Sequence, residues 1–291
     1  MASDQGPVVQ SALLRSELVK LRKAKGLTQE QVAKALEWSP SKLIRLEGGR
    51  SSITKTDLDA LLNEYGISSE SQRDRLHALN RGARSAGWWN AYRGQVPSGY
   101  LNFIGYEAGA SFIRAFQSTL VPGLLQTREY AEVLTAQIVD PMELSSVVNL
   151  RMQRQEELAR RSKLPRRYFV MDEAVIRRHV GVKKDPGIMP RQLEHIANVI
   201  EEERELVTVR IIPFQAGAHA GMFGPFTLLE FEGDLSDVLY LEWGPEGTEA
   251  LIQGPDERVT DYAASFESLL EEALSAEESL ELIRTVAEEL S

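Results

Sequence analysis

Apolar residues recur at helical spacing through the first third of the chain. One run has leucines at i, i+4 and i+7 and stops at a glycine, as helices commonly do: Leu14, Leu18, Leu21 and Gly26. A later run over 54–65 carries a stripe of Leu58, Leu61, Leu62 and Tyr65, and residues 70–84 continue with a helical pattern. The pattern therefore predicts a helix in each of these three segments.

Two shorter helices are predicted between the first run and residue 50. Thr28 and Gln31 have the spacing of a capping box, in which the N-cap hydroxyl and the amide three residues on satisfy each other's backbone N–H groups. Ser39 before Pro40 is a second N-cap with proline at the first helical position, and Gly48-Gly49 ends that helix. Two short helices joined in this way predict a helix-turn-helix.

The second helix of this unit has two distinct faces. At about 100° per residue, Leu43 and Leu46 share the core face, Ser41, Ile44 and Arg45 project oppositely, and Lys42 lies on the flank. Cations in the first turns are unfavourable next to the positive end of the helix dipole. A polyanion that lies against this face would offset that cost. Arginine can donate two hydrogen bonds to the O6 and N7 atoms of guanine in the major groove, so we expect Arg45 to contact DNA bases. Ile44 is either a thymine-methyl contact or an ordinary exposed aliphatic residue, and both interpretations stay open.

The helix-turn-helix segment also carries a specific set of residues: Gly26 to Glu30, Val32, Ala33, Ser39 to Leu46, and Glu47 to Gly49. With these, residues 12–66 resemble the Xre family of repressors, the Cro and phage-repressor type. The resemblance implies a repressor-type DNA-binding domain, and the helical patterns above give this all-α domain five helices. Many members of that family have glycine in the turn where this chain has Glu37.

The resemblance also implies roles for individual residues, each expected at the position that matches the family's motif. By the resemblance, Ser41, Lys42 and Arg45 would contact bases, and Gln29 and Arg50 would contact phosphates. Ile44 is a further candidate base contact, and Thr28 and Ser51 are further candidate phosphate contacts. Arg22 and Glu47 would form a structural ion pair that braces the first helix against the reader helix.

Charge is divided unevenly between the two parts of the chain. The formal net charge of the 291 residues is −10, which is unfavourable for a DNA-binding protein if spread evenly. Residues 1–84 hold 14 of the 33 Lys and Arg and 10 of the 43 Asp and Glu, a net of +4, so the remainder has a net charge of −14. A local basic surface suffices for phosphate binding, and the acidic part would disfavour nonspecific coating of DNA.

The composition excludes several classes of protein. There are no cysteines, which excludes disulfides, thiolate catalysis and thiolate metal sites. No apolar run approaches the roughly 20 residues of a membrane span. Residues 1–10 lack the basic-then-apolar pattern of a signal peptide, so we expect a disordered tail. We therefore expect a cytoplasmic, nucleoid-associated protein with no membrane partner.

The second part of the chain predicts an α+β domain with a small sheet and flanking helices, over 105–291. It follows a helix-turn-helix domain over 11–84 and a linker over 85–104. Helices are expected at about 106–117, 125–138, 141–163, 189–203, 258–273 and 276–290, and strands at 168–171, 207–212, 226–231 and 238–243. The linker's aromatic residues either stack on a ligand or pin the segment onto a core, and we favour the second interpretation. These residues are Trp88, Trp89, Tyr92 and Tyr100.

A second set of motifs runs through this domain: Phe116-Gln117 with Leu120 to Thr127, Arg151 to Gln155, Asp172 to Ala174, Arg178, Val180-Gly181, Pro213-Phe214, Gly217 to His219, and Gly224 to Phe226. With these, residues 100–287 resemble the C-terminal domain of the actinobacterial WhiJ-like, antitoxin-like Xre regulators. The resemblance implies a non-enzymatic domain that binds an effector or a small partner protein encoded nearby.

An enzymatic role rests only on His219, which lies in a glycine-rich loop, and on Asp172 and Glu173 at a strand end. The usual zinc, nucleophile-elbow and phosphate-loop motifs are absent from the sequence. We therefore expect no catalytic residues, no metal and no cofactor. The loop remains a candidate ligand or partner surface, through Gly217, His219, Gly221 and Gly224.

Three hypotheses follow. The first is a homodimeric transcription regulator that binds a near-palindromic double-stranded operator and whose acidic domain responds to a small partner protein. The second is a repressor with a small-molecule effector pocket in that domain. The third, which we do not favour, is an enzyme with a DNA-targeting head.

Overall fold

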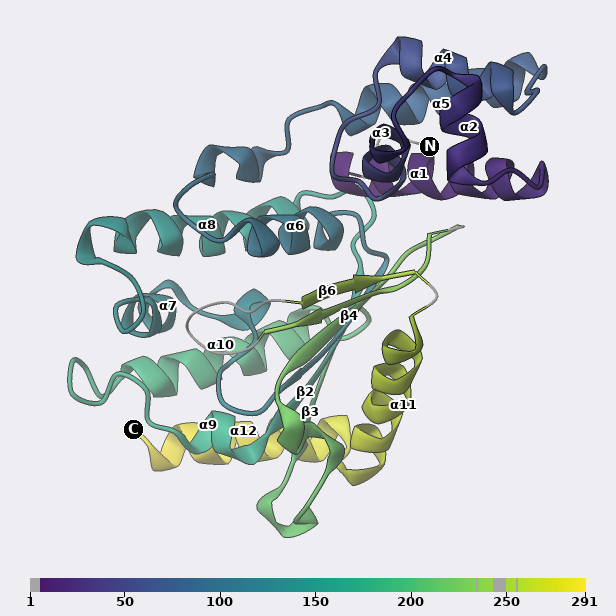
Figure 1. The fold of residues 1–291 in the computed structure, drawn as a ribbon. Coiled ribbons are helices and arrows are strands. Elements are labelled where there is room, and N and C mark those ends of the chain that lie inside the picture. Colours follow the sequence, from purple (N-terminus) through teal and green to yellow (C-terminus); the bar gives the residue numbers. More distant parts are fainter. Residues whose placement is uncertain (1–5, 234, 243–249, 255) are drawn as a thin grey trace. The chain divides into compact units, whose positions relative to one another are not determined.

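The structure, a computed structural model, describes residues 6–233, 235–242, 250–254 and 256–291 (Figure 1). The chain divides into two compact units, Met1–Trp88 with Gly233–Leu235, and Trp89–Glu232 with Ser236–Ser291. The first unit is helical and the second combines a mixed sheet with flanking helices, so the expected α+β fold class is confirmed.

The first unit contains the five expected helices. They are α1 (Pro7–Ala24), α2 (Gln29–Ala35), α3 (Pro40–Glu47), α4 (Lys55–Glu64) and α5 (Glu70–Ala83). Both hydrogen bonds of the capping box at Thr28 are present, and Pro40 opens α3 as expected. Ser39 occupies the N-cap position of α3, but its side chain makes no capping hydrogen bond.

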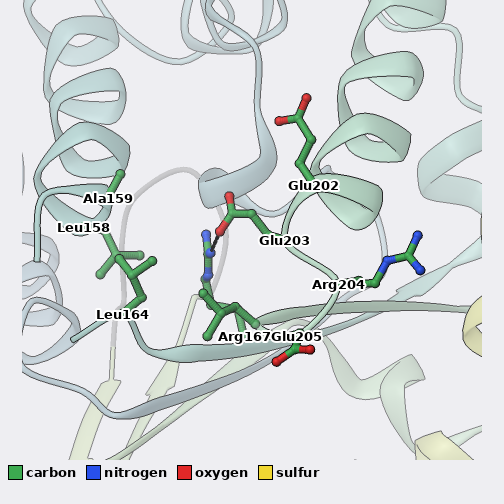
Figure 2. A pocket seen from close by; sticks show the side chains of 9 residues that line it. Leu158, Ala159, Leu164, Arg167, Glu202, Glu203, Arg204 and Glu205 are labelled. Atoms are coloured by element: carbon green, nitrogen blue, oxygen red, sulfur yellow. Dashed lines mark hydrogen bonds and ion pairs between the residues drawn. The ribbon is translucent and has the colours of Figure 1, made fainter. Parts of the chain in front are cut away.

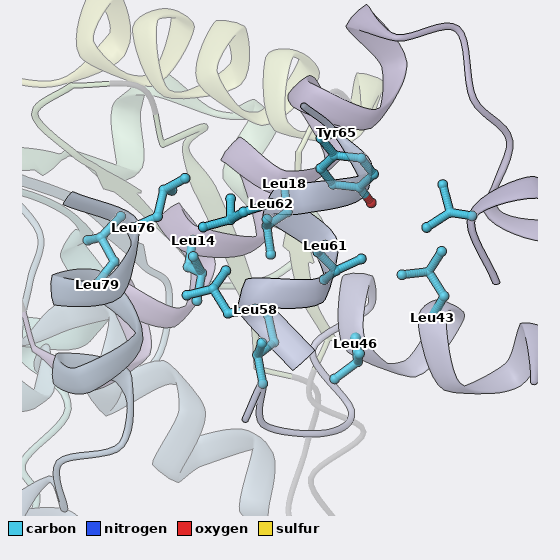
Figure 3. Close-up of a cluster of buried hydrophobic side chains, with 12 residues drawn as sticks. Leu14, Leu18, Leu43, Leu46, Leu58, Leu61, Leu62, Tyr65, Leu76 and Leu79 are labelled. Atoms are coloured by element: carbon cyan, nitrogen blue, oxygen red, sulfur yellow. The ribbon is translucent and has the colours of Figure 1, made fainter. Parts of the chain in front are cut away.

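Leucines from four of these helices, α1, α3, α4 and α5, fill the core of the first unit (Figure 3). Leu14 and Leu18 come from α1, and Leu43 and Leu46 are the contribution of α3. The sequence stripe of the fourth helix is buried in full, with Leu58, Leu61, Leu62 and Tyr65 at most 1% exposed. The apolar periodicity therefore placed the core face of each helix correctly.

The expected disordered tail over 1–10 is wrong for its described end. Helix α1 begins at Pro7, and Val9 is fully buried. The physical reason is tertiary: α1 packs along α5, and the side chain of Gln10 lies against Gly82 of that helix. Two valines after a proline show no helical period of their own. The first turn of α1 could therefore not be predicted without knowing that it packs on α5.

A six-stranded mixed sheet forms the centre of the second unit, in the order β3-β2-β1-β4-β5-β6. The strands are β1 (Phe112–Gln117), β2 (Arg166–Asp172), β3 (Val207–Ile212), β4 (Phe226–Glu230), β5 (Val238–Leu241) and β6 (Ala250–Gln253). Strands β1, β2 and β3 are parallel, whereas β4 pairs antiparallel with both β1 and β5, and β5 with β6. Four of these strands were expected from the sequence.

The helix expected over 106–117 is wrong, because the second half of that segment is the central strand β1. Ile113 faces one side of the sheet and Phe116 the other, and both are buried. A strand buried on two faces shows no clean alternation of apolar and polar residues, so its sequence could not be told from a buried helix. Strand β6 is four residues long and was also missed.

The helices of the second unit are α6 (Ser98–Glu107), α7 (Arg128–Thr135), α8 (Pro141–Ala159), α9 (Glu173–Arg177), α10 (Ile188–Glu202), α11 (Glu257–Glu272) and α12 (Ala276–Glu289). Helix α11 packs on one face of the sheet through Phe266 and Leu269. Helix α12 lies beside α10 and contacts β3, and the hydroxyl of the buried Ser279 accepts the N–H of Ile211 at 2.9 Å.

The linker expected over 85–104 is also corrected by the structure. A 3₁₀ turn, η1 (Trp88–Tyr92), and most of α6 occupy it. Trp89 is 5% exposed, and the hydroxyl of Tyr92 donates to Gln153 of α8 at 2.9 Å. The aromatic residues therefore pin the segment to the core, which is the interpretation favoured from the sequence.

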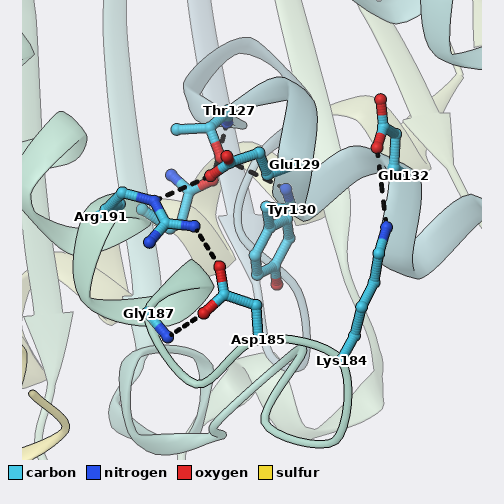
Figure 4. A network of polar contacts seen from close by, with 9 residues as sticks. Thr127, Glu129, Tyr130, Glu132, Lys184, Asp185, Gly187 and Arg191 are labelled. Atoms are coloured by element: carbon cyan, nitrogen blue, oxygen red, sulfur yellow. Dashed lines mark hydrogen bonds and ion pairs between the residues drawn. The ribbon is translucent and has the colours of Figure 1, made fainter.

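A network of polar contacts holds α7 against the start of α10 (Figure 4). The buried side chain of Gln192 accepts the N–H of Thr127 and donates to the carbonyl of Leu125, each at 2.7 Å. Exposed ion pairs surround this contact: Arg191 with Glu129 and Asp185, and Lys184 with Glu132. The segment that precedes α7 is therefore held in one conformation by side chains far along the chain.

A buried ion pair joins α6 to α8. The Arg154 guanidinium donates to both carboxylate oxygens of Glu107 at 2.5 Å, and the two side chains are 10% and 2% exposed. Burial disfavours the charge of Arg154, but the nearby Glu107 more than offsets this and raises the pKa of Arg154 above its ordinary value. The Arg154 charge is therefore balanced by a carboxyl group that is buried beside it.

Loss of one partner should destabilise the second unit strongly. We expect Glu107→Ala to lower the free energy of unfolding by about 3–5 kcal/mol, because it leaves the Arg154 charge buried and uncompensated. Urea unfolding of the full chain, followed by circular dichroism, measures the change. Lys163→Ala is the control, since its ion pair with Glu232 is exposed and should contribute almost nothing. Equal effects of the two substitutions would contradict the conclusion that the Glu107–Arg154 pair is buried and stabilises the second unit.

Candidate nucleic-acid interface

Helix α3 buries one face and exposes the other. Leu43 and Leu46 are 0% and 3% exposed in the core of the first unit. Ser41, Ile44 and Arg45 are exposed, and 47% of the Ile44 side chain is open to solvent. The face predicted to contact bases is therefore accessible. A short helix with an exposed arginine and isoleucine presents the donors and the apolar contact used in the major groove.

Lys42 differs from the other predicted base contacts because the structure commits it elsewhere. Its ammonium group lies 2.6 Å from a carboxylate oxygen of Asp57 in α4 and 3.7 Å from the ring centre of Trp38. Burial alone would raise the pKa of Asp57, but its hydrogen bonds with Lys42 and Thr54 hold the pKa below the ordinary value. Lys42 thus fastens the start of α3 to α4 before any ligand is present.

The other end of α3 is fastened by Arg22 and Glu47. Two guanidinium nitrogens of Arg22 donate to the two oxygens of Glu47 at 2.7 and 2.9 Å. A third donates to the carbonyl of Leu27 at 2.9 Å. The hydrogen bond to Glu47 is the main reason that the pKa of Arg22 is raised. The side chains are 11% and 8% exposed, so this pair is shielded from solvent and ties α1 to α3.

The predicted phosphate contacts lie at the two ends of the helix-turn-helix. Arg50 and Ser51 are exposed in the turn after α3, where the N–H of Arg50 donates to the carbonyl of Arg45 at 2.9 Å. The Thr28 hydroxyl is occupied by the N–H of Gln31 at 3.2 Å. Gln29 donates its amide to Glu47 at 2.7 Å, so it also braces the ion pair, which the sequence did not indicate.

The turn between α2 and α3 contains the one described non-glycine residue with positive φ. Glu37 has φ of 56° and follows the end of α2, where Trp38 donates its N–H to the carbonyl of Ala33 at 2.8 Å. This left-handed conformation costs a residue with a Cβ roughly 1–2 kcal/mol. The family resemblance had marked this position because glycine is common there.

The glycine-rich loop of the second unit has two short 3₁₀ turns, η3 (Phe214–Ala216) and η4 (Ala220–Phe223). Gly217 and Gly224 have φ of 74° and 122°, in the region that favours glycine. Gly221 is buried, and a Cβ there would lie 2.1 Å from the ring of Phe116. The loop is therefore held close to β1.

His219 anchors this loop and is not presented to solvent. Its side chain is 4% exposed, Nε2 lies 3.1 Å from Oδ2 of Asp172, and its ring meets Phe116 edge-on at 5.8 Å. Glu173 accepts the N–H of Phe214 at 2.7 Å and pairs with Arg177. The two carboxylates thus fix the loop at two points. Within the described residues, no three His, Asp or Glu side chains gather as a metal site would require.

Exposed apolar residues on the same loop were missed from the sequence. Phe214, Met222 and Phe223 are 56%, 69% and 82% exposed. The available signal in the sequence was the pair Met222-Phe223, two large apolar residues between glycines in a segment with no helical or strand period. These three residues are called the loop patch below, since exposed apolar side chains that gather on one surface mark interaction sites.

A hollow of about 340 Å³ lies between the end of α8 and the turn before β3 (Figure 2). Leu158, Leu164 and Leu206 supply its apolar wall. Arg167 within it is paired with Glu203, and Glu202, Arg204 and Glu205 give its rim mixed charge. The hollow contains none of the residues singled out from the sequence.

Comparison with known protein families identifies both units. Residues 100–285 match the family described as Domain of unknown function (DUF5753), and residues 13–76 match a helix-turn-helix domain. No curated protein and no solved structure matched the chain. None of the described helices combines the length and apolar character needed to cross a membrane.

Relief of the strained turn gives a test of the helix-turn-helix geometry. We expect Glu37→Gly to stabilise the first unit by about 0.5–1 kcal/mol, because the gain at positive φ exceeds the added freedom of the unfolded chain. Thermal unfolding of the full chain measures this. Glu30→Gly, at an exposed helical position of α2, should instead destabilise by about 1 kcal/mol. A loss of stability in Glu37→Gly would show that the turn is not left-handed.

Proposed function

Because this chain belongs to the family of the Domain of unknown function (DUF5753) and carries a helix-turn-helix domain ahead of it, we propose that it is a sequence-specific regulator of transcription. The helix-turn-helix makes it a DNA-binding regulator. Sequence specificity, dimerisation and control by the second unit are the parts that we propose, and we propose no catalytic role.

One observation carries the proposal. Helix α3 buries only Leu43 and Leu46 and exposes Ser41, Ile44 and Arg45 together. A homodimer would place two such helices about 34–36 Å apart, one turn of DNA, on a near-palindromic operator. The net charge of +4 over residues 1–84 supports phosphate binding by this end of the chain alone.

We further propose that the second unit, in the antitoxin-like manner of the WhiJ-like regulators, responds to a small partner protein. The loop patch supports this, because Phe214, Met222 and Phe223 expose apolar surface on a segment that is held rigid by Asp172 and Glu173. Rigid loops that expose aromatic residues lose little entropy on binding, which favours recognition.

A small-molecule effector is the second candidate for control. It is favoured by a cavity of about 260 Å³ in the second unit, which apolar and aromatic side chains line together with two arginines.

Base reading by α3 is tested by a matched pair of arginines. We expect Arg45→Ala to lower affinity for the operator by about 1–3 kcal/mol and to relax specificity, whereas Arg50→Ala should weaken operator and random DNA alike. Gel shifts with the chain's own promoter fragment and a scrambled fragment measure both ratios, at two salt concentrations. An unchanged specific-to-random ratio in Arg45→Ala would remove Arg45 from the base-contacting face.

Partner binding is tested at the loop patch. We expect Phe223→Asp to abolish the rise in unfolding temperature that the small protein encoded beside this chain produces in the wild type. Met142→Asp is the control, since Met142 is 93% exposed but lies on α8. If both variants still respond to the partner, the loop patch is not its binding surface.

A further inference from the structure

The cavity in the second unit lies on the face of the sheet opposite α11. Strand β1 contributes Ile113 and Ala115 to its floor, whereas Phe116, from the other face of β1, packs with α11. Side chains of α6 and α8 form its opposite wall. Its volume of about 260 Å³ exceeds the roughly 150 Å³ that accepts benzene, and falls below the roughly 300 Å³ typical of drug-sized ligands. The space therefore fits a small ring system.

Aromatic rings give this cavity a flat apolar wall. Phe103 of α6 stacks on Tyr240 of β5 with ring centres 4.1 Å apart, and both residues line the space. Phe169 and Leu124 complete the apolar lining. An apolar ring placed here would be removed from water on several sides.

Two arginines of α8, one turn apart, line the cavity with different electrostatic roles. Arg154 is neutralised by Glu107, and also donates to the hydroxyl of Tyr100 at 3.1 Å. Arg151 has no carboxylate partner within the described residues, and its Nε is buried without a hydrogen bond there. Glu242 lines the same space but is exposed, so water screens its charge. Arg151 is thus a partly buried cation available to an anion.

Gln126 supplies a second unsatisfied group. Its side chain is 3% exposed and donates to the carbonyl of Val121 at 2.8 Å. Gln126 lines the cavity, and its Oε1 is buried with no hydrogen-bond donor among the described residues. Buried acceptors are normally paired, so a ligand donor that reached this oxygen as the side chain turned toward the cavity would satisfy it.

We propose that this cavity binds a small amphipathic acid. Its carboxylate pairs with Arg151, a hydroxyl or amine donates to Gln126, and its ring lies against Phe103 and Tyr240. This site would be where the small-molecule effector proposed above binds. Only its effect on DNA binding rests on that proposed function. Binding itself follows from the cavity and its two unsatisfied groups.

Calorimetry with the full chain tests the chemistry of the site with three matched probes. These are 6-hydroxy-2-naphthoate, 2-naphthoate without the donor, and 2-naphthol without the acid. We expect the hydroxy acid to bind most tightly and 2-naphthol about tenfold or more weakly, because a hydrogen bond to a charged group is lost. Equal affinities of the acid and 2-naphthol, or no binding by any probe, would overturn the proposal.

Variants separate the anchor from the cavity. Arg151→Gln should remove the preference for acid over 2-naphthol. Arg160→Gln, at the exposed C-cap of the same helix, should keep it. Ala115→Leu should fill the floor and block all three probes, with circular dichroism to verify folding. Retention of the acid preference in Arg151→Gln would also overturn the proposal.

A promoter gel shift with the same hydroxy acid distinguishes ligand binding at the cavity from control of DNA binding by that ligand. Binding in the calorimeter with no change in DNA affinity would refute effector control and leave the site intact. Absence of binding, with normal gel shifts, would refute the site and leave the DNA-binding function intact.

Discussion

The position of helix α3 depends on the ion pair between Arg22 and Glu47. Helix α3 has eight residues and buries two leucines, which is too little to hold a helix of this length by itself. The shielded pair fixes its C-terminal end to α1, and the bond of Lys42 to Asp57 fixes its start to α4. A helix fastened at both ends presents Ser41, Ile44 and Arg45 with little freedom, which favours specific contacts to bases over transient ones.

The second unit is organised around strand β1, which is hydrogen-bonded to a parallel strand on one side and an antiparallel strand on the other. One face of this strand packs with α11 and the other forms the floor of the cavity. Because β1 is hydrogen-bonded along both edges, two neighbouring strands hold the cavity floor in place. The walls come from α6, α7 and α8, which the Glu107–Arg154 pair and the Gln192 hydrogen bonds hold in place.

In both units, some cationic side chains among the described residues are paired with carboxylates inside the fold and others are not. Arg22, Lys42 and Arg154 have carboxylate partners and act as internal fastenings. Arg45 is exposed, and Arg151 lies at a cavity without a described carboxylate partner. In the glycine-rich loop, His219 is likewise an anchor, and the neighbouring apolar side chains are what the loop offers to solvent. Our proposals therefore concern Arg45, Arg151 and the loop patch, which the described residues do not use as internal fastenings.

The sequence by itself determined the features whose signals lie within a few residues. Capping at Thr28, the core face of α3 and the stripe of α4 follow from helical geometry, so they were predicted correctly. Tertiary structure decided the rest. Strand β1, the buried start of α1 and the packed aromatic segment around Trp89 depend on partners far along the chain. For the same reason only the fold could show that Lys42 is held by Asp57, fifteen residues away, while Arg45 remains exposed.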